Sequence, residues 1–125
     1  MIDWKRYPNF SAGEFKCAHC GAEGIKDELL AKLQAMRTEY GKPMRITSGY
    51  RCPQHPVEAK KSTPGAHALG IAADIGVEGA EAHRVLALAM KHGFTGVGVQ
   101  QKGTGRFIHV DTRNGQLPTP AVWSY

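Results

Sequence analysis

Long apolar runs are missing from this sequence: none approaches the roughly 20 residues that a helix needs to cross a bilayer. Residues 1–8 place no apolar stretch behind their charges, so we expect no secretory signal peptide. Only three cysteines occur, an odd number, and a disulfide framework is therefore not expected. Repeats and low-complexity segments are also missing, and the composition disfavours disordered, collagen-like and coiled-coil chains.

Clusters of positive charge are scarce as well, although the chain is basic overall. Lysine and arginine number 16 against 11 acidic residues, which gives a net charge of +5. Such a balance favours anionic partners, namely nucleic acid, phospholipid or an acidic cell-wall polymer. The basic residues are scattered, however, and aromatic residues are not interleaved with them as a nucleic-acid platform requires. We therefore expect neither a nucleic-acid nor a membrane partner.

The remaining composition is ordinary for a small globular domain. The chain has 125 residues, of which 42% are apolar and 22% charged. A chain of this length buries roughly two thirds of its unfolded surface, so it can form a stable core without disulfides or structural metal ions. We predict a single domain over residues 1–125 that acts as a monomer.

The spacing of apolar residues predicts two helices and several short strands. Helices are expected from Asp27 to the stop at Gly41, and over about 79–92. A strand is expected at Met44–Ser48, a compact apolar run covers Ile71–Val77, and Gly96–Gln100 and Phe107–Asp111 form a candidate hairpin. Residues 51–66 are a loop rich in Pro, Lys and Ser. This mixture predicts an α+β fold: a small antiparallel sheet with flanking helices.

Polar residues inside the apolar runs are the informative ones. Asp74 lies within the run at 71–77, and His109 and Asp111 lie within the last strand. Alternate residues of a strand share a face, so His109 and Asp111 point together while their neighbours point into the core. An unpaired charge at such a position is costly, so these side chains are either hydrogen-bonded or bound to a metal.

A zinc site is one interpretation of this pattern. His67 precedes Asp74 by seven residues, and with His109 the set has two imidazoles and one carboxylate. Three such ligands with an open fourth position are typical of catalytic zinc. The alternative interpretation is structural: Asp74 caps a turn, and His109 is a hydrogen-bonded core histidine.

Three motifs in order resemble one known family. Residues 67–74, His-Ala-Leu-Gly-Ile-Ala-Ala-Asp, resemble the H-x-x-G-x-A-x-D motif of the zinc D-Ala-D-Ala carboxypeptidases, the fifteenth family of metallopeptidases. Residues 48–51, Ser-Gly-Tyr-Arg, are similar to its S-G-Y-R element, and residues 107–111 to its closing H-x-D or H-x-H strand. The resemblance runs from Phe10–Phe15 to residues 122–125, nearly the whole chain. Within the group, the chain resembles short phage and prophage peptidases and bacterial murein endopeptidases.

The resemblance implies a fold, a cofactor and an activity. The fold would be the α+β fold shared with the hedgehog signalling domain. His67, Asp74 and His109 match the family's zinc ligands, and Arg51 matches the arginine that contacts substrate, with Ser48 beside it. The implied function is a zinc-dependent peptidase that hydrolyses a stem or cross-link peptide of bacterial peptidoglycan, as an endolysin-like endopeptidase. Two alternatives are a D-Ala-D-Ala carboxypeptidase and a non-catalytic zinc module that binds cell wall or protein.

The sequence departs from the family pattern at the expected general base. Many members place an acid three residues before the last histidine, where this chain has Arg106. Asp111 is the nearest remaining carboxylate and is predicted to be catalytic; the alternative is that it orients His109 or Arg51. Arg51 has an alternative too, as an arginine that pairs with Glu58 or Asp74.

The cysteines form a further pattern. Cys17 and Cys20 are spaced C-x-x-C, and Cys52 and His55 are spaced C-x-x-H. Together they match a structural zinc site of the Cys₃His type, provided that the fold brings the two loops together. The alternative is that these are ordinary reduced cysteines.

The expected location follows from the resemblance and from the N-terminal residues. Without a visible signal peptide, we expect the protein to be made in the cytoplasm and to act on the cell wall after phage-type release or as a virion component. Its positive charge would favour approach to an anionic wall.

Overall fold

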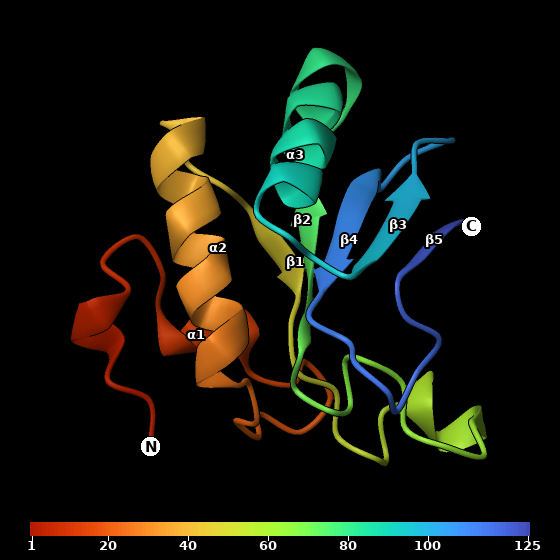
Figure 1. Cartoon of the computed structure of the whole chain (residues 1–125). Helices are drawn as coiled ribbons and strands as arrows, with labels where there is room; N and C mark the ends of the chain where they lie inside the picture. The colour runs from red at the N-terminus through yellow and green to blue at the C-terminus, as the bar shows by residue number, and fades with distance from the viewer.

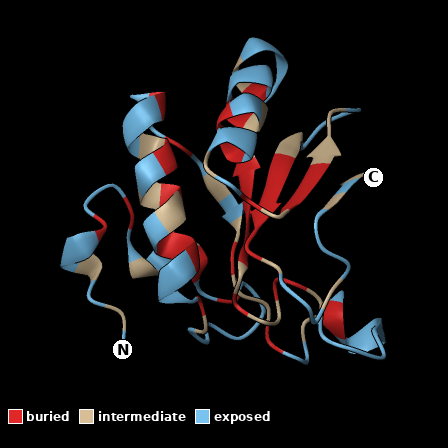
Figure 2. Ribbon diagram, viewed as in Figure 1, coloured by how far each residue is buried: buried red, intermediate tan, exposed pale blue.

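The computed structural model describes all residues, 1–125, and places a five-stranded sheet at the centre of the molecule (Figure 1). The strands lie in the order β1-β2-β4-β3-β5. Their bounds are Ile46–Ser48 (β1), Ala72–Gly76 (β2), Gly96–Gln100 (β3), Phe107–Asp111 (β4) and Ala121–Ser124 (β5). The three central strands are almost completely buried (Figure 2).

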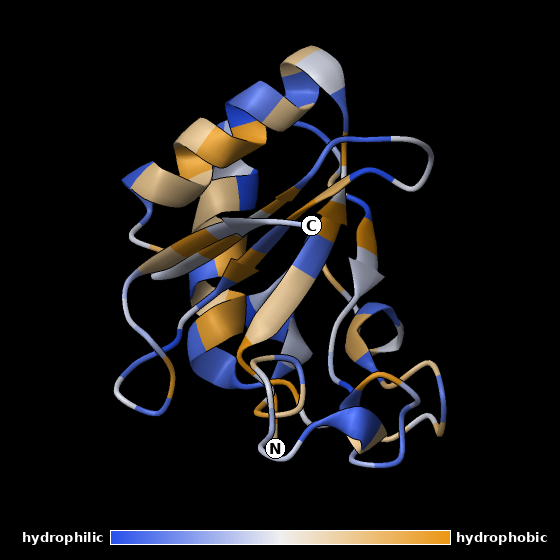
Figure 3. Cartoon of the chain, turned by 90° about the vertical axis from the view of Figure 1, so that its right-hand side faces the viewer, coloured by the Kyte–Doolittle hydropathy of each residue, from blue (hydrophilic) through white to orange (hydrophobic).

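Two long helices, α2 (Asp27–Tyr40) and α3 (Gly79–Lys91), cover the same face of the sheet (Figure 1). Helix α2 ends where Gly41 adopts a left-handed conformation, with φ at +78°, and its N–H bonds to the Arg37 carbonyl. Helix α3, at the top of Figure 3, carries both hydrophobic and hydrophilic residues along its length, and the apolar sides of both helices line the core.

Strict alternation along the central strands divides the sheet into two faces. The core face carries Ala73 and Ile75 of β2, Val97 of β3, and Ile108 and Val110 of β4, all of which belong to the apolar cluster under the helices. The other face carries the residues between them, and the chain from Gly49 to Ile71 loops along one end of the sheet (Figure 1). We call this second face the site face.

The predicted α+β fold is confirmed, and so are both long helices and the hairpin of β3 and β4. The predicted strand at 44–48 is shorter, beginning at Ile46. The expectation of a purely antiparallel sheet is wrong in one respect: β5 pairs parallel with β3. The backbone N–H of Ala121 bonds to the Thr95 carbonyl at 2.9 Å, which guides the tail along that edge.

Short helical turns occupy the segments that the sequence marks as irregular. They are η1 (Trp4–Arg6), α1 (Ala12–Phe15) and, within the 51–66 loop, η2 (Glu58–Lys60). Ser11 and Glu14 form a reciprocal capping pair at the start of α1. None of the helices has both the length and the apolar character needed to cross a membrane.

Candidate metal centre

A row of aligned residues crosses the site face from one edge of the sheet to the other. Each member is the Cα partner of the next: Ser48, Asp74, His109, Gly98 and Trp123. Cross-strand neighbours project from the same face of a sheet. The row therefore places the Asp74 carboxylate directly beside the His109 imidazole.

His67 reaches this row from a turn rather than from a strand. The turn closes at Gly70, whose φ is +76° and whose carbonyl accepts the N–H of Lys26 at 2.8 Å. A Cβ at position 70 would lie only 2.0 Å from the Gly24 carbonyl oxygen, so only glycine fits there. The close approach of these two backbone segments directs the His67 ring toward β2.

The structure brings the three predicted metal ligands together. One ligand atom each from His67, Asp74 and His109 lies within 4.8 Å of the other two, and all three residues are buried. His67 Nε2 is 3.3 Å from Asp74 Oδ1, and His109 Nδ1 is 3.0 Å from the same oxygen.

The outer nitrogens of both imidazoles are engaged by acceptors. His67 Nδ1 is 2.7 Å from the Gly49 carbonyl, which can only accept, so this nitrogen carries the proton. His109 Nε2 is 2.7 Å from Asp111 Oδ2, which fixes the opposite tautomer. When both rings are neutral, each would therefore direct its remaining lone pair toward Asp74, the arrangement in which outer partners orient metal-ligating histidines.

The electrostatics of the cluster favour a cation. Burial raises the pKa of the Asp74 carboxyl, but the hydrogen bonds and charges of His109 and His67 outweigh it and hold this pKa well below its usual range. Burial lowers the pKa of His109, yet its bonds to Asp111 and Asp74 produce a net rise. When both rings are neutral, their lone pairs and the Asp74 carboxylate repel one another unless a cation lies among them. The donor set fits zinc.

Arg51 lies at the edge of this cluster and is held by two carboxylates. Its Nη2 is 3.7 Å from Asp74 Oδ2, and its Nη1 is 3.8 Å from Glu58 Oε2. The pairing foreseen as an alternative role is therefore present. The Nε of Arg51 is buried without any hydrogen-bond partner, although a fifth of the side chain remains exposed. An unsatisfied donor of this kind is unusual in a buried position, where polar groups are normally hydrogen-bonded.

Glu58 fixes Arg51 from the far side. Its two oxygens accept from Lys61 Nζ at 2.8 Å and from the Gly65 N–H at 3.2 Å. Burial raises the pKa of Glu58, but Lys61, the Gly65 N–H and Arg51 together lower it below the ordinary value. The carboxylate therefore stays ionised and anchors both cations of this loop.

Asp111 is fully enclosed on the opposite side of the His109 ring from Asp74. Arg113 donates to its two oxygens from Nε at 3.0 Å and from Nη2 at 2.8 Å, and the Arg113 N–H adds a third bond. Burial opposes ionisation, but His109 and Arg113 lower the pKa of Asp111 to about 2. Asp111 was predicted to be catalytic, with orientation of His109 or Arg51 as the alternative. These contacts support orientation of His109; Arg51 is held by Asp74 and Glu58 instead.

Sequence reasoning missed the two glycines that make room for this arrangement. A Cβ at Gly96 would lie 2.1 Å from Asp111 Oδ1, and a Cβ at Gly98 would lie 2.6 Å from the Trp123 ring. Gly98 lets Trp123 cross β3 and reach His109, with ring centroids 4.9 Å apart. The Gly-Val-Gly-Val pattern at 96–99, with valine on the core face, was the available signal.

Arg113 was also missed. Its guanidinium lies over the Trp123 ring, 4.5 Å from the centroid, while it binds Asp111. It follows Asp111 by two residues and therefore shares its face, a spacing that could have identified it. Arg106, which stands where the family has an acid, bonds to the Gly103 carbonyl and lies 3.8 Å from Glu78.

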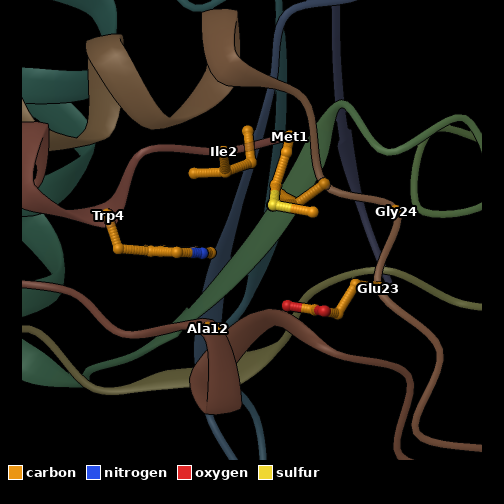
Figure 4. Close-up of a pocket in the computed structure, with 7 residues that line it drawn as sticks. Met1, Ile2, Trp4, Ala12, Glu23 and Gly24 are labelled. Carbon is orange, nitrogen blue, oxygen red and sulfur yellow. The ribbon is translucent and has the colours of Figure 1, made fainter.

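Several cavities lie outside the three-ligand cluster. One of about 450 Å³ is lined by Ser48 and Arg51 together with Cys17 and His55, but by none of the three ligands. Ser48 is half-buried there, at the start of the row. Another cavity of about 430 Å³ lies between the N-terminal residues and the 23–25 segment, with Met1, Trp4 and Glu23 around it (Figure 4). No metal-ligand candidate lines the second cavity.

Comparison with known protein families gives one match. The model of the Peptidase M15 family covers residues 8–111, which include the whole candidate metal centre. The chain therefore belongs to the M15 metallopeptidase family, whose members are typically zinc-dependent. No curated protein matches the chain.

Proposed function

We propose that this protein is a zinc-dependent peptidase that hydrolyses a peptide bond in the stem or cross-link peptides of bacterial peptidoglycan. The observation that carries the proposal is the convergence of His67, Asp74 and His109, with both outer ring nitrogens already engaged, in a chain of the M15 family. The net charge of +5 favours approach to an anionic wall. Release of the phage type would bring the protein there.

Three residues would bind the metal, and two further groups orient the histidine rings. His67, Asp74 and His109 would hold the metal, while the Gly49 carbonyl and Asp111 keep the two rings in the required tautomers. When bound, zinc acts as a Lewis acid that polarises a peptide carbonyl and acidifies water.

Arg51 is suited to bind the substrate. A guanidinium holds a carboxylate through two parallel bonds and also stabilises developing negative charge on a carbonyl oxygen. A fifth of the Arg51 side chain is exposed, and Arg51 lines the cavity beside Ser48, so a peptide carboxylate or carbonyl can approach the guanidinium there. Glu58 and Asp74 keep the guanidinium in place before substrate arrives.

Digestion of purified peptidoglycan tests the proposal. We expect released peptides with the zinc-loaded protein and none after chelation, with activity restored by added zinc. Asp74→Asn should be inactive, while His83→Ala, a change at an exposed position of α3, should match the wild type. Full activity of Asp74→Asn, or activity that survives chelation, would contradict the proposal.

Mass spectrometry of the products separates an endopeptidase from a carboxypeptidase. An endopeptidase leaves shortened or uncoupled muropeptides, whereas a D-Ala-D-Ala carboxypeptidase releases free D-alanine.

A non-catalytic module is the second candidate, and one observation favours it. Position 106 holds an arginine, and Asp111, the other carboxylate of the motif, is enclosed by His109 and Arg113. Such a module would bind cell wall or protein. It would sediment with peptidoglycan in a zinc-dependent manner and release no peptides from it.

A further inference from the structure

Three cysteines converge at a second place, outside the His67–Asp74–His109 cluster. The Sγ atoms of Cys17, Cys20 and Cys52 all lie within 4.8 Å of one another, and all three thiols are free. Cys17 and Cys52 are buried, while Cys20 is exposed. The first two come from the loop after α1 and the third from the segment that follows β1, so the fold has assembled the group from distant parts of the chain.

The backbone holds the first pair in a tight loop. The Gly21 N–H bonds to the Cys17 carbonyl at 2.7 Å, and the Cys17 N–H bonds to the Ala22 carbonyl at 2.8 Å. Gly21 has a φ of +76°, which returns the chain after Cys20. Both sulfurs therefore project from one side of the loop.

Close backbone packing brings the third cysteine to this loop. The Tyr50 N–H bonds to the Phe15 carbonyl at 2.8 Å, and a Cβ at Gly49 would lie 2.7 Å from Phe15 Cα. The Cys52 N–H then points at Cys17 Sγ, 3.2 Å away. Main-chain contacts thus hold together the two loops that carry the cysteines.

The thiols differ in their readiness to ionise. Burial raises the pKa of Cys17, but the backbone N–H groups of Cys52, Cys20 and His19 outweigh it and lower this pKa to about 7. Burial and the two neighbouring sulfurs raise the pKa of Cys52.

We propose that Cys17, Cys20 and Cys52 bind a zinc ion through their three thiolates, separately from the His67–Asp74–His109 cluster. Thiolates are preferred ligands of zinc in structural sites, and N–H groups directed at a sulfur stabilise its charge there. The proposal does not depend on the protein being a peptidase.

His55 is not part of the converging group, which differs from the Cys₃His pattern in the sequence. Its Nδ1 accepts the Val57 N–H at 3.1 Å, and its ring lies edge-on to that of His19, 6.2 Å away. We assign three protein ligands to the site, and a solvent molecule on the side of the exposed Cys20 would complete the four-coordinate shell of the zinc ion.

A zinc ion at this site would connect two segments of the chain. Cys52 directly follows Arg51, so a zinc ion there ties the N-terminal loop to the segment that carries the guanidinium. The cavity of about 450 Å³ is lined by both Cys17 and Arg51. Zinc at the cysteines would therefore position Arg51 without touching the substrate.

X-ray absorption at the zinc edge tests the proposal on the full chain, purified under reducing conditions and loaded with zinc. In His109→Ala, where the histidine site is disabled, the remaining zinc should show sulfur neighbours at about 2.3 Å. Cobalt substitution should add near-ultraviolet thiolate-to-metal absorption. Zinc surrounded only by nitrogen and oxygen, or alkylation mapping that finds two of the three cysteines disulfide-bonded in the zinc-loaded protein, would overturn the proposal.

Variants locate the ion independently of catalysis. Cys20→Ser changes only an exposed side chain and should remove the zinc–sulfur scattering and one equivalent of bound zinc. The zinc ion at His67, Asp74 and His109 should stay bound. Cys20→His, which restores a ligand atom, should recover most of that zinc. If Cys20→Ser binds as much zinc as the wild type, the cysteine site does not exist. An inactive enzyme with intact zinc–sulfur scattering would contradict only the peptidase proposal.

Discussion

The two faces of the central sheet carry residues of opposite kinds, although the same strands supply both. The core face of β2 and β4 presents Ile75, Ile108 and Val110 to the helices. The site face of the same strands presents Asp74, His109 and Asp111, all buried yet fully partnered by polar groups. Alternation by one residue thus separates the apolar contacts that stabilise the fold from the groups that could hold a metal.

The glycines sharpen this contrast. On β3 the core face has Val97 and Val99, while the site face has Gly96 and Gly98, which leave space for side chains from β4 and β5. A strand usually loses stability through glycine. Here the space lets Asp111 meet Arg113 and lets Trp123 reach His109.

The largest effect on activity is expected from a substitution on the site face of β4. His109→Ala should lower activity by on the order of a thousandfold or more. Zinc contributes several kcal/mol of transition-state stabilisation, and each 1.36 kcal/mol that is lost slows the reaction about tenfold. Elemental analysis should show loss of the zinc at this site. Full zinc retention would exclude His109 as a ligand.

Its neighbour Ile108 serves as the matched control on the core face. Ile108→Ala should lower the free energy of unfolding by about 2–5 kcal/mol, measured by denaturant titration. The folded fraction should keep its zinc and its kcat. If both variants lose metal to the same degree, the two faces are not independent.

Part of this division could be predicted from the sequence. The β3–β4 hairpin was predicted residue for residue, because its alternating runs flank a turn. The pairing of Asp74 with His109 could not be derived by alternation alone, because register between distant strands depends on the whole fold. Family resemblance, rather than periodicity, indicated that the two meet.

The tail could not be predicted as a strand. In β5, Val122 is 72% exposed and Trp123 packs on the site face, so no apolar stripe marks the segment. Its parallel pairing rests on backbone bonds to β3, which leave no trace in the sequence. The roles of Trp123 and Arg113 were hidden for the same reason.

Arg51→Lys should have the next largest effect. A lysine ammonium keeps the positive charge but lacks the planar pair of donors, so kcat/KM should fall on the order of a hundredfold while zinc stays bound. Arg45→Lys, which alters an exposed arginine just before β1, is the control. Near wild-type kcat/KM for Arg51→Lys would show that the guanidinium does not bind the substrate.

Asp111→Asn separates the two roles of that carboxylate. If Asp111 orients His109, the amide should weaken zinc binding by about tenfold to a hundredfold, and excess zinc should restore kcat. If Asp111 instead accepts the proton, zinc stays bound and kcat falls by on the order of a hundredfold at any zinc concentration. Competition with a chelating dye and a rate measurement at saturating zinc distinguish these outcomes.

Gly98→Ala should have the smallest effect and tests whether the space over β3 matters. The added methyl group would overlap the Trp123 ring, which must move away from His109, and such overpacking costs about 1–3 kcal/mol of stability. Zinc affinity should fall only slightly, because His109 keeps its bond to Asp111. The double variant Gly98→Ala with Trp123→Ala should recover stability relative to Trp123→Ala alone, since the methyl then fills the space that the indole leaves. A Gly98→Ala variant as stable as the wild type, with unchanged tryptophan fluorescence, would show that Trp123 does not need this gap.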